Sequence, residues 1–347
     1  MSPIIKSVIC IVCAVLFLVI PTSFMTACTN QFLVEDMVQE EESEQNPEEG
    51  LIVVGVSQVG SESIWRTAHT ASIQETLTTE NGYYLIFDNA RQKQENQIKA
   101  IRNFISQDVD YIVLSPITET GWDTVLSEAK DAGIPVILMD RMVDIEDDSL
   151  YTAWIGSDFE EEGKNAGYWL EEYLEKKEMT EEDINIVVLQ GTEGSTSVIG
   201  RTRGFESVAK KNQNWHILEQ VDADFKTAKG YEVMQYFLEE YEDIDVVVSQ
   251  NDDMTFGALE AMEEAGISTG KDGDVIMISF DAVKAALEKV KDGEINVDIE
   301  CNPLQGQYID RIIRDMEKGK LEEKMFYTVE RVFTPENVGL VIDDRTY

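Results

Sequence analysis

The sequence is poor in cysteine, and this shortage excludes a scaffold built on disulfide bonds. Only four cysteines occur in 347 residues. Cys10 and Cys13 lie in an apolar N-terminal run that we expect to be removed, and Cys28 closes that run. Cys301 is then left without a cysteine to pair with. Secreted domains that depend on disulfides contain even numbers of cysteines at close spacing, so this chain must be stabilised by its hydrophobic core instead.

Histidine and basic residues are also scarce. Two histidines, His69 and His216, give little support to a histidine-based metal site or catalytic scheme, so we expect no metal and no cofactor. Lysine and arginine number 28 against 68 aspartates and glutamates, and the formal net charge is −40. Such a surface repels nucleic-acid phosphates and anionic lipids. We therefore expect no nucleic-acid partner and no membrane contact except through an anchor.

Residues 1–28 have the pattern of an export signal. Lys6 precedes an apolar run over residues 8–20, which is too short for a comfortable transmembrane helix and is followed by Pro21. Cys28 comes after small residues, and its thiol is suited to carry a diacylglycerol. This segment resembles a bacterial lipoprotein signal, which implies lipidation of Cys28. The alternative is an ordinary cleaved signal in which the cysteine is incidental.

Two further regions follow the signal. Residues 29–50 are rich in glutamate and poor in apolar residues, which predicts an acidic disordered tether. From residue 51 to 347, short apolar runs alternate with amphipathic segments of helical length. The apolar runs cover residues 51–56, 83–87, 111–114, 136–139, 184–189, 245–248, 275–278 and 295–299, and the amphipathic segments 93–107, 122–132, 160–176, 226–241, 254–265 and 304–318.

This alternation predicts the α/β class, with doubly wound parallel sheets covered by helices on both faces. Ten or more strands are too many for one sheet of ordinary size, so two lobes are expected. Ligands of such sheets bind beyond the carboxyl ends of the strands. Polar residues collect at those ends, among them Trp65-Arg66, Asp140-Arg141, Arg201, Asn251 and Asp281. Each of these residues alone could equally well cap a helix or form an ion pair. Their convergence at the strand ends favours a binding site for a neutral polyol.

Several longer stretches resemble one family closely. They are VSQVGSES (56–63), Trp65-Arg66, QKQENQIKA (92–100), TGW (120–122), EAKDAGIPV (128–136), LQGT (189–192), NDDM (251–254) and GKD (270–272). The chain resembles type I periplasmic sugar-binding proteins of the ribose/galactose group, and most of all the galactofuranose-binding proteins of sugar ABC transporters.

The resemblance implies two lobes joined by a hinge of three crossings. We place the first lobe at about 51–156 and 282–325 and the second at about 157–281 and 326–347. The residues implied to hold the sugar are Glu62, Ser63, Trp65, Arg66, Asp140, Arg141, Arg201, Asn251 and Asp281, with Phe225 and Asn302 as weaker candidates.

The implied function is that of an extracytoplasmic lipoprotein, anchored to the bacterial cell membrane. It would capture a galactofuranose-like monosaccharide as a monomer and deliver it to an ABC transporter permease. A binding protein that serves a sensor kinase or chemoreceptor is an open alternative. An exported glycoside hydrolase with paired carboxylates is a further alternative, although the resemblance predicts binding without chemistry. A sugar-sensing repressor is disfavoured because an export signal stands where a basic DNA-binding motif would be needed.

Overall fold

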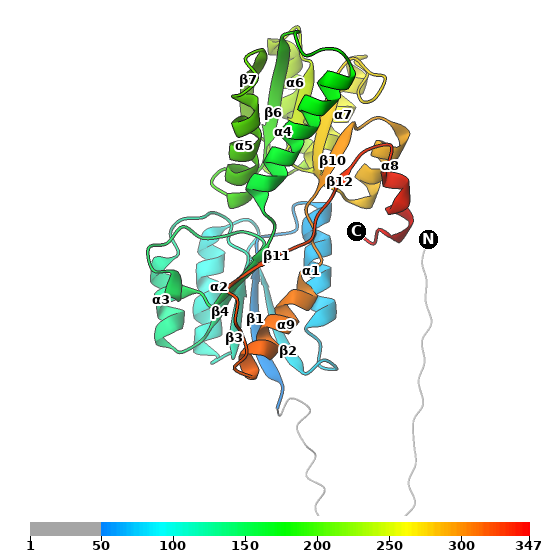
Figure 1. The fold of residues 1–347 in the computed structure, drawn as a ribbon. Coiled ribbons are helices and arrows are strands. Elements are labelled where there is room, and N and C mark those ends of the chain that lie inside the picture. The colour runs from blue at the N-terminus through cyan, green and yellow to red at the C-terminus, as the bar shows by residue number, and fades with distance from the viewer. Residues whose placement is uncertain (1–49) are drawn as a thin grey trace, which may run out of the picture. The chain divides into compact units, whose positions relative to one another are not determined.

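The computed structural model describes residues 50–347, which belong to one compact unit. The predicted signal, its Cys28 and the tether up to residue 49 lie outside the described residues. The chain forms two α/β lobes, each with a six-stranded sheet (Figure 1). The predicted fold class is therefore confirmed.

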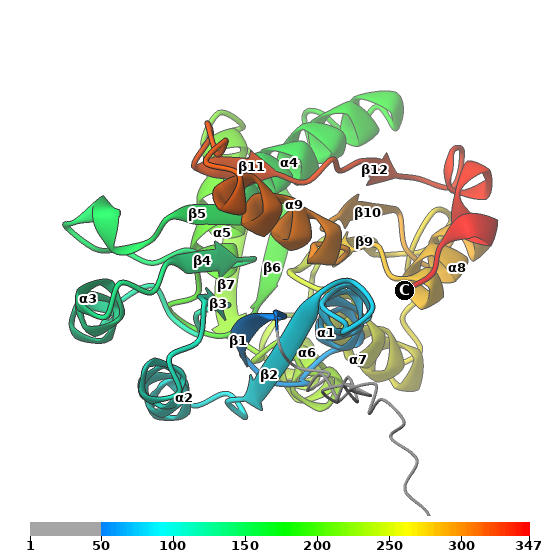
Figure 2. The ribbon, with the colours of Figure 1, turned by 90° about the horizontal axis from the view of Figure 1, so that it is seen from below.

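The first lobe contains a sheet in the order β11-β5-β4-β3-β1-β2, with all neighbours parallel. Its strands are β1 (Ile52–Gln58), β2 (Tyr83–Asn89), β3 (Tyr111–Leu114), β4 (Val136–Met139), β5 (Ala153–Gly156) and β11 (Met325–Tyr327). Its helices are α1 (Ile64–Thr76), α2 (Gln94–Ser106), α3 (Asp123–Asp131) and α9 (Gly306–Glu317). Helices α1 and α9 cover one face of the sheet, and α2 and α3 cover the other (Figure 2).

The second lobe repeats this plan in the order β12-β10-β9-β8-β6-β7, with one antiparallel pair at the β12 edge. Its strands are β6 (Ile184–Gln190), β7 (Trp215–Asp222), β8 (Val246–Ser249), β9 (Ile276–Asp281), β10 (Val297–Glu300) and β12 (Val332–Phe333). Its helices are α4 (Phe159–Lys176), α5 (Thr196–Ala209), α6 (Thr227–Glu240), α7 (Asp252–Glu264) and α8 (Lys284–Asp292).

The apolar strands are explained by helices on both faces of each sheet. In β6, Ile186 and Val188 pack with α4 and α5, whereas Val187 and Leu189 pack with α6, α7 and α8. Alternate residues of a strand point to opposite faces, so a strand covered on both sides must be apolar throughout. Within residues 50–347, no helix is both long enough and apolar enough to cross a membrane.

The chain passes between the lobes three times, at about residues 156–158, 301–305 and 328–331. Two of the predicted boundaries are wrong. Residues 282–300 were expected in the first lobe, but α8 and β10 belong to the second, because β10 continues the parallel sheet beside β9. The last crossing follows Tyr327 rather than the predicted boundary at 325/326, because β11 first pairs with β5 in the first lobe.

Candidate functional site

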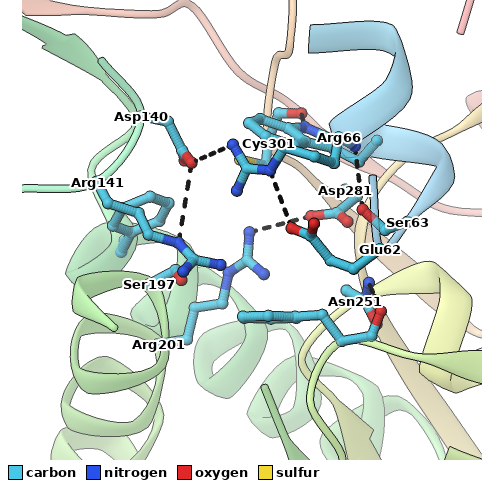
Figure 3. A pocket seen from close by; sticks show the side chains of 13 residues that line it. Glu62, Ser63, Arg66, Asp140, Arg141, Ser197, Arg201, Asn251, Asp281 and Cys301 are labelled. Atoms are coloured by element: carbon cyan, nitrogen blue, oxygen red, sulfur yellow. Dashed lines mark hydrogen bonds and ion pairs between the residues drawn. The ribbon is translucent and has the colours of Figure 1, made fainter. Parts of the chain in front are cut away.

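A pocket lies where the carboxyl ends of the strands of both sheets meet. Thirteen side chains line it (Figure 3). They are Glu62, Ser63, Trp65, Arg66, Asp140, Arg141, Phe159, Ser197, Arg201, Phe225, Asn251, Asp281 and Cys301. All nine residues that the sequence resemblance implied are in this set. These nine residues lie up to 219 positions apart in the chain, and the structure brings them together in one cavity.

Arg66 forms the centre of an ion-pair network in the first lobe. Its Nη1 lies 2.7 Å from Asp140 Oδ2, and its Nε donates to Glu62 Oε1 at 3.0 Å. Burial would raise the pKa of Asp140, but the charges of Arg66 and Arg141 outweigh burial and lower it. Burial likewise opposes the charge on Arg66, and Asp140 and Glu62 overcome it and raise the pKa of the guanidinium. Asp140 and Arg66 are therefore both charged at neutral pH.

Arg201 organises the second lobe in a similar way. Its Nε donates to Glu162 Oε2 at 2.6 Å, and its Nη2 donates to Asp281 Oδ1 at 3.2 Å. Its Nη1 donates to the backbone oxygen of Gln250. Burial raises the pKa of Asp281 and of Glu162, against the opposing charge of Arg201. The guanidinium is held by three acceptors, so it presents a fixed polar edge to the pocket.

Two buried polar atoms of the pocket lack a hydrogen-bond partner among the described residues. They are Glu62 Oε2 and Arg141 Nε. Arg141 donates from Nη1 to the backbone oxygen of Ile117 at 2.8 Å and lies over the ring of Phe225. Arg141 Nε lies 3.9 Å from Asp140 Oδ2, which is an ion pair but too long for a hydrogen bond. Buried polar groups are nearly always hydrogen-bonded in native proteins, so an acceptor and a donor without hydrogen bonds in one cavity favour a polar ligand with both kinds of group.

Two of the predicted site residues use a side-chain oxygen to cap a helix. The hydroxyl of Ser63 accepts from the amide of Arg66 at 3.0 Å and caps α1. Asn251 Oδ1 accepts from the amide of Met254 at 2.9 Å and caps α7. The capping alternative is therefore correct for these oxygens. The side-chain nitrogen of Asn251 donates one hydrogen to the backbone oxygen of Phe225 at 3.5 Å, which leaves its second N–H as the group through which Asn251 can meet a ligand.

Unusual backbone conformations mark the same cavity. Asp140, Phe225 and Asp281 have φ values of +61°, +58° and +107°. Positive φ values are uncommon outside glycine, and such strained residues cluster at ligand sites. At Asp140 and Asp281 the strain occurs where a β-strand ends, and it accompanies a carboxylate that lines the pocket. Backbone strain at two carboxylates that line the pocket supports this cavity as the candidate binding site.

The aromatic residues have both packing and lining roles. Trp65 is 4% exposed, packs in the core and donates from Nε1 to the backbone oxygen of Cys301 at 2.7 Å. Phe225, a weaker candidate, lines the pocket, whereas Asn302 does not. Phe159, Ser197 and Cys301 were missed. Their places in the topology could have indicated them. Phe159 and Ser197 lie in the first turns of α4 and α5, and Cys301 follows the end of β10.

The lobes contact one another around the pocket. The amide of Ile64 in the first lobe donates to Asp253 Oδ2 in the second at 2.9 Å. The amide of Met142 donates to Thr196 Oγ1 at 3.0 Å. Burial raises the pKa of Asp253 to about 6. These contacts join the edges of the cavity, so the structure has the arrangement of lobes closed over a site.

A two-lobed fold with a closed polar pocket between the lobes defines a solute-binding protein. Residues 54–320 match the family model described as periplasmic binding protein domain. The chain belongs to the periplasmic binding protein family, type I. This membership confirms the predicted family and the prediction of a binding protein rather than an enzyme.

Three similar proteins bear on the ligand. The galactofuranose-binding protein YtfQ of Escherichia coli is 39% identical over 82% of this chain and 88% of its own. A Mycobacterium smegmatis protein in complex with β-D-fucofuranose is 40% identical, with a TM-score of 0.81 over 85% of this chain and 95% of its own. The periplasmic binding protein of the arabinose ABC transporter from Shewanella sp. ANA-3, bound to L-arabinofuranose, is 40% identical with a TM-score of 0.78 and the same coverage.

Proposed function

We propose that this chain is the extracytoplasmic solute-binding component of an ABC transporter and that it binds a neutral monosaccharide in the furanose form. The charge of the pocket carries the proposal. Three guanidinium groups, of Arg66, Arg141 and Arg201, are matched by three carboxylates in the lining. The balanced set disfavours an anion or a cation as ligand. Paired oxygens and guanidinium forks instead suit the neighbouring hydroxyls of a neutral sugar.

The walls of the cavity agree with this ligand. The rings of Trp65, Phe159 and Phe225 lie in the walls. Aromatic faces pack against the apolar C–H side of a sugar. The three similar proteins are named for, or bound to, furanose sugars, and this supports the five-membered ring for this chain.

Each predicted site residue has a proposed role. Glu62 and Arg141 contact hydroxyl groups through their unpaired Oε2 and Nε atoms. Asp140 and Arg66 bind neighbouring hydroxyls from the first lobe, and the second-lobe residues Arg201, Asn251 and Asp281 bind the opposite side. Ser63 fixes the start of α1, and Trp65 provides the apolar wall. The sugar is fully enclosed only when both lobes meet, so binding favours the closed state.

Delivery to a permease requires the protein to stay at the membrane. We propose that Cys28 carries a diacylglycerol and that the acidic segment after it spaces the domain from the bilayer. Two acyl chains anchor a protein stably, whereas one holds it only marginally. The sugar-loaded domain then meets the permease as a monomer. The ABC transporter named for the Shewanella protein supports transport as the role.

Calorimetric titration tests the proposal. D-galactose, D-fucose and L-arabinose equilibrate between ring forms in water, so each is titrated into the wild-type protein. We expect saturable binding of at least one of them, with no further heat after saturation. Arg141→Met should weaken that binding at least tenfold, because the unpaired Nε donor is lost. Arg203→Met is the matched control, since Arg203 is an exposed arginine of α5 that does not line the pocket. A wild-type protein that binds none of these sugars contradicts the proposal.

A further inference from the structure

Glu330 lies on the third crossing between the lobes, outside the pocket lining. One oxygen of its carboxylate, Oε1, accepts hydrogen bonds from all three crossings. The hydroxyl of Ser157 donates from the first crossing. The amide of Asn302 donates from the second at 2.9 Å, and the hydroxyl of Thr328 donates from the third at 2.7 Å. A single side-chain atom therefore links the three segments about which the lobes must rotate.

We propose that Glu330 is the positioning residue of the hinge: it fastens the three crossings together and restrains the lobes near the closed arrangement. Hinge motion is absorbed by changes of φ and ψ in a few residues at the ends of elements. When the crossings twist apart, donors on different segments cannot all stay within hydrogen-bond reach of one oxygen. The Glu330 contacts therefore favour the closed state over the open one. This inference rests on the proposed sugar-binding function.

The chemistry of the group suits this task. Hydrogen bonds to a carboxylate are stronger than those between neutral groups. Burial raises the pKa of Glu330, but the donors from Ser157, Asn302 and Thr328 oppose the shift and favour the charged form. Backbone contacts connect the crossings less completely. The amide of Thr328 donates to the oxygen of Gly156 at 3.0 Å, which joins only the first and third segments.

The Glu330 contacts are continuous with the floor of the pocket. Ligand-type atoms of Glu162, Cys301 and Glu330 lie within 4.8 Å of one another. Cys301 lines the pocket, and its Sγ lies 3.3 Å from Ser157 Oγ. Glu162 holds Arg201, a proposed sugar ligand, at 2.6 Å. A change at the hinge thus reaches the pocket residue Cys301 through Ser157, which contacts both Glu330 and Cys301, without Glu330 lining the pocket.

The test compares three variants of the full chain. Glu330→Ala removes the shared acceptor. Glu330→Gln keeps an oxygen acceptor on the side chain and should bind sugar nearly as tightly as the wild-type protein. Glu323→Ala is the matched control, because Glu323 is exposed in the segment before β11. Titration with D-galactose, D-fucose and L-arabinose should show at least tenfold weaker binding for Glu330→Ala, but binding within threefold of wild type for Glu330→Gln and Glu323→Ala.

Small-angle scattering of the ligand-free proteins gives the readout that a purely structural role would not move. Glu330→Ala should have a larger radius of gyration than wild type and than Glu330→Gln, while its circular dichroism remains that of a folded protein. If Glu330→Ala does not fold, Ser157→Ala replaces it, since that change removes the donor from one crossing only. Unchanged affinity together with an unchanged ligand-free radius overturns the proposal.

Failure of the two proposals can be told apart. If the wild-type protein binds none of the three sugars, the proposed function fails. The hinge proposal is then judged by the ligand-free radius alone, where a difference between Glu330→Ala and Glu330→Gln supports it and equal radii refute it. If the wild type binds and only the Glu330→Ala effect is missing, the hinge proposal fails and the sugar-binding function stands.

Discussion

Replacing Asp140 by asparagine is the sharpest test of the first-lobe half of the site. The change keeps the size of the side chain, and asparagine tolerates the φ of +61° found at this position. It removes the negative charge that lies 2.7 Å from Arg66 Nη1 and that accepts from Ser115 Oγ at 3.1 Å. The effect therefore reports the carboxylate rather than the backbone.

The magnitude follows from the burial of the pair. Asp140 and Arg66 are both 3% exposed, so solvent screens their interaction little. A hydrogen bond to a charged group contributes about 1.5–3 kcal/mol, which corresponds to a loss of sugar affinity of about 10- to 150-fold. Asp140 also neutralises Arg66, so Asp140→Asn leaves a buried guanidinium with Glu62 as its remaining carboxylate and should lower the melting temperature as well.

The assay is calorimetric titration with whichever of D-galactose, D-fucose and L-arabinose binds the wild type. Asp144→Asn is the control, because Asp144 is exposed in the same loop. A loss below about twofold for Asp140→Asn, in a protein that is folded by circular dichroism, would show that Asp140 has only a structural role and would refute its assignment as a sugar ligand.

Two further predictions concern pH and the membrane. Burial raises the pKa of Asp298 to about 8 and also raises that of the neighbouring Asp252. The same carboxyl in the unfolded chain loses its proton near pH 4, so the contribution of Asp298 to stability should fall as pH rises from about 4 to 8, by about 1.4 kcal/mol per pH unit for one retained proton. Asp298→Asn should weaken the pH dependence of the free energy of unfolding, measured by denaturant titration, by the equivalent of about one proton. An unchanged pH dependence would contradict the raised pKa of Asp298. In the producing cell, Cys28→Ala should release the protein from the membrane or leave an uncleaved precursor, with sugar affinity unchanged; native protein whose mature N-terminus is not Cys28 would contradict lipidation.

Much of the fold could be predicted because each sheet is covered on both faces. Strands such as β3 and β4 then read as uninterrupted apolar runs, and the amphipathic helices between them are easily seen. The edge strand β7 was not predicted, since its residues are mostly half-exposed and mix polar with apolar side chains. The predicted lobe boundary at Asp281 was wrong because the sequence pattern of a βαβ unit is the same in either lobe. Which sheet β10 joins depends on tertiary packing.

The site was predictable to the extent that topology places it. Polar residues after β4 lie at the carboxyl edge of the first sheet, those after β8 and β9 lie at the carboxyl edge of the second, and their types indicated a polyol. Cys301 gave no such signal, because it lines the pocket with a buried thiol and with a backbone oxygen that holds Trp65. The role of Glu330 could not be predicted either. Its three donors come from positions up to 171 residues apart in the chain, and only the folded hinge brings them together.

The ring form of the bound sugar decides whether the pocket is specific for furanoses. The protein is crystallised with D-galactose, D-fucose or L-arabinose, whichever binds in titration. We expect a five-membered ring between the lobes, with hydroxyl groups within hydrogen-bond distance of Glu62 Oε2 and Arg141 Nε and with Asp140 and Asp281 on opposite sides. A six-membered ring in the pocket would contradict furanose specificity. A sugar bound elsewhere, with the pocket empty, would contradict the assignment of the site.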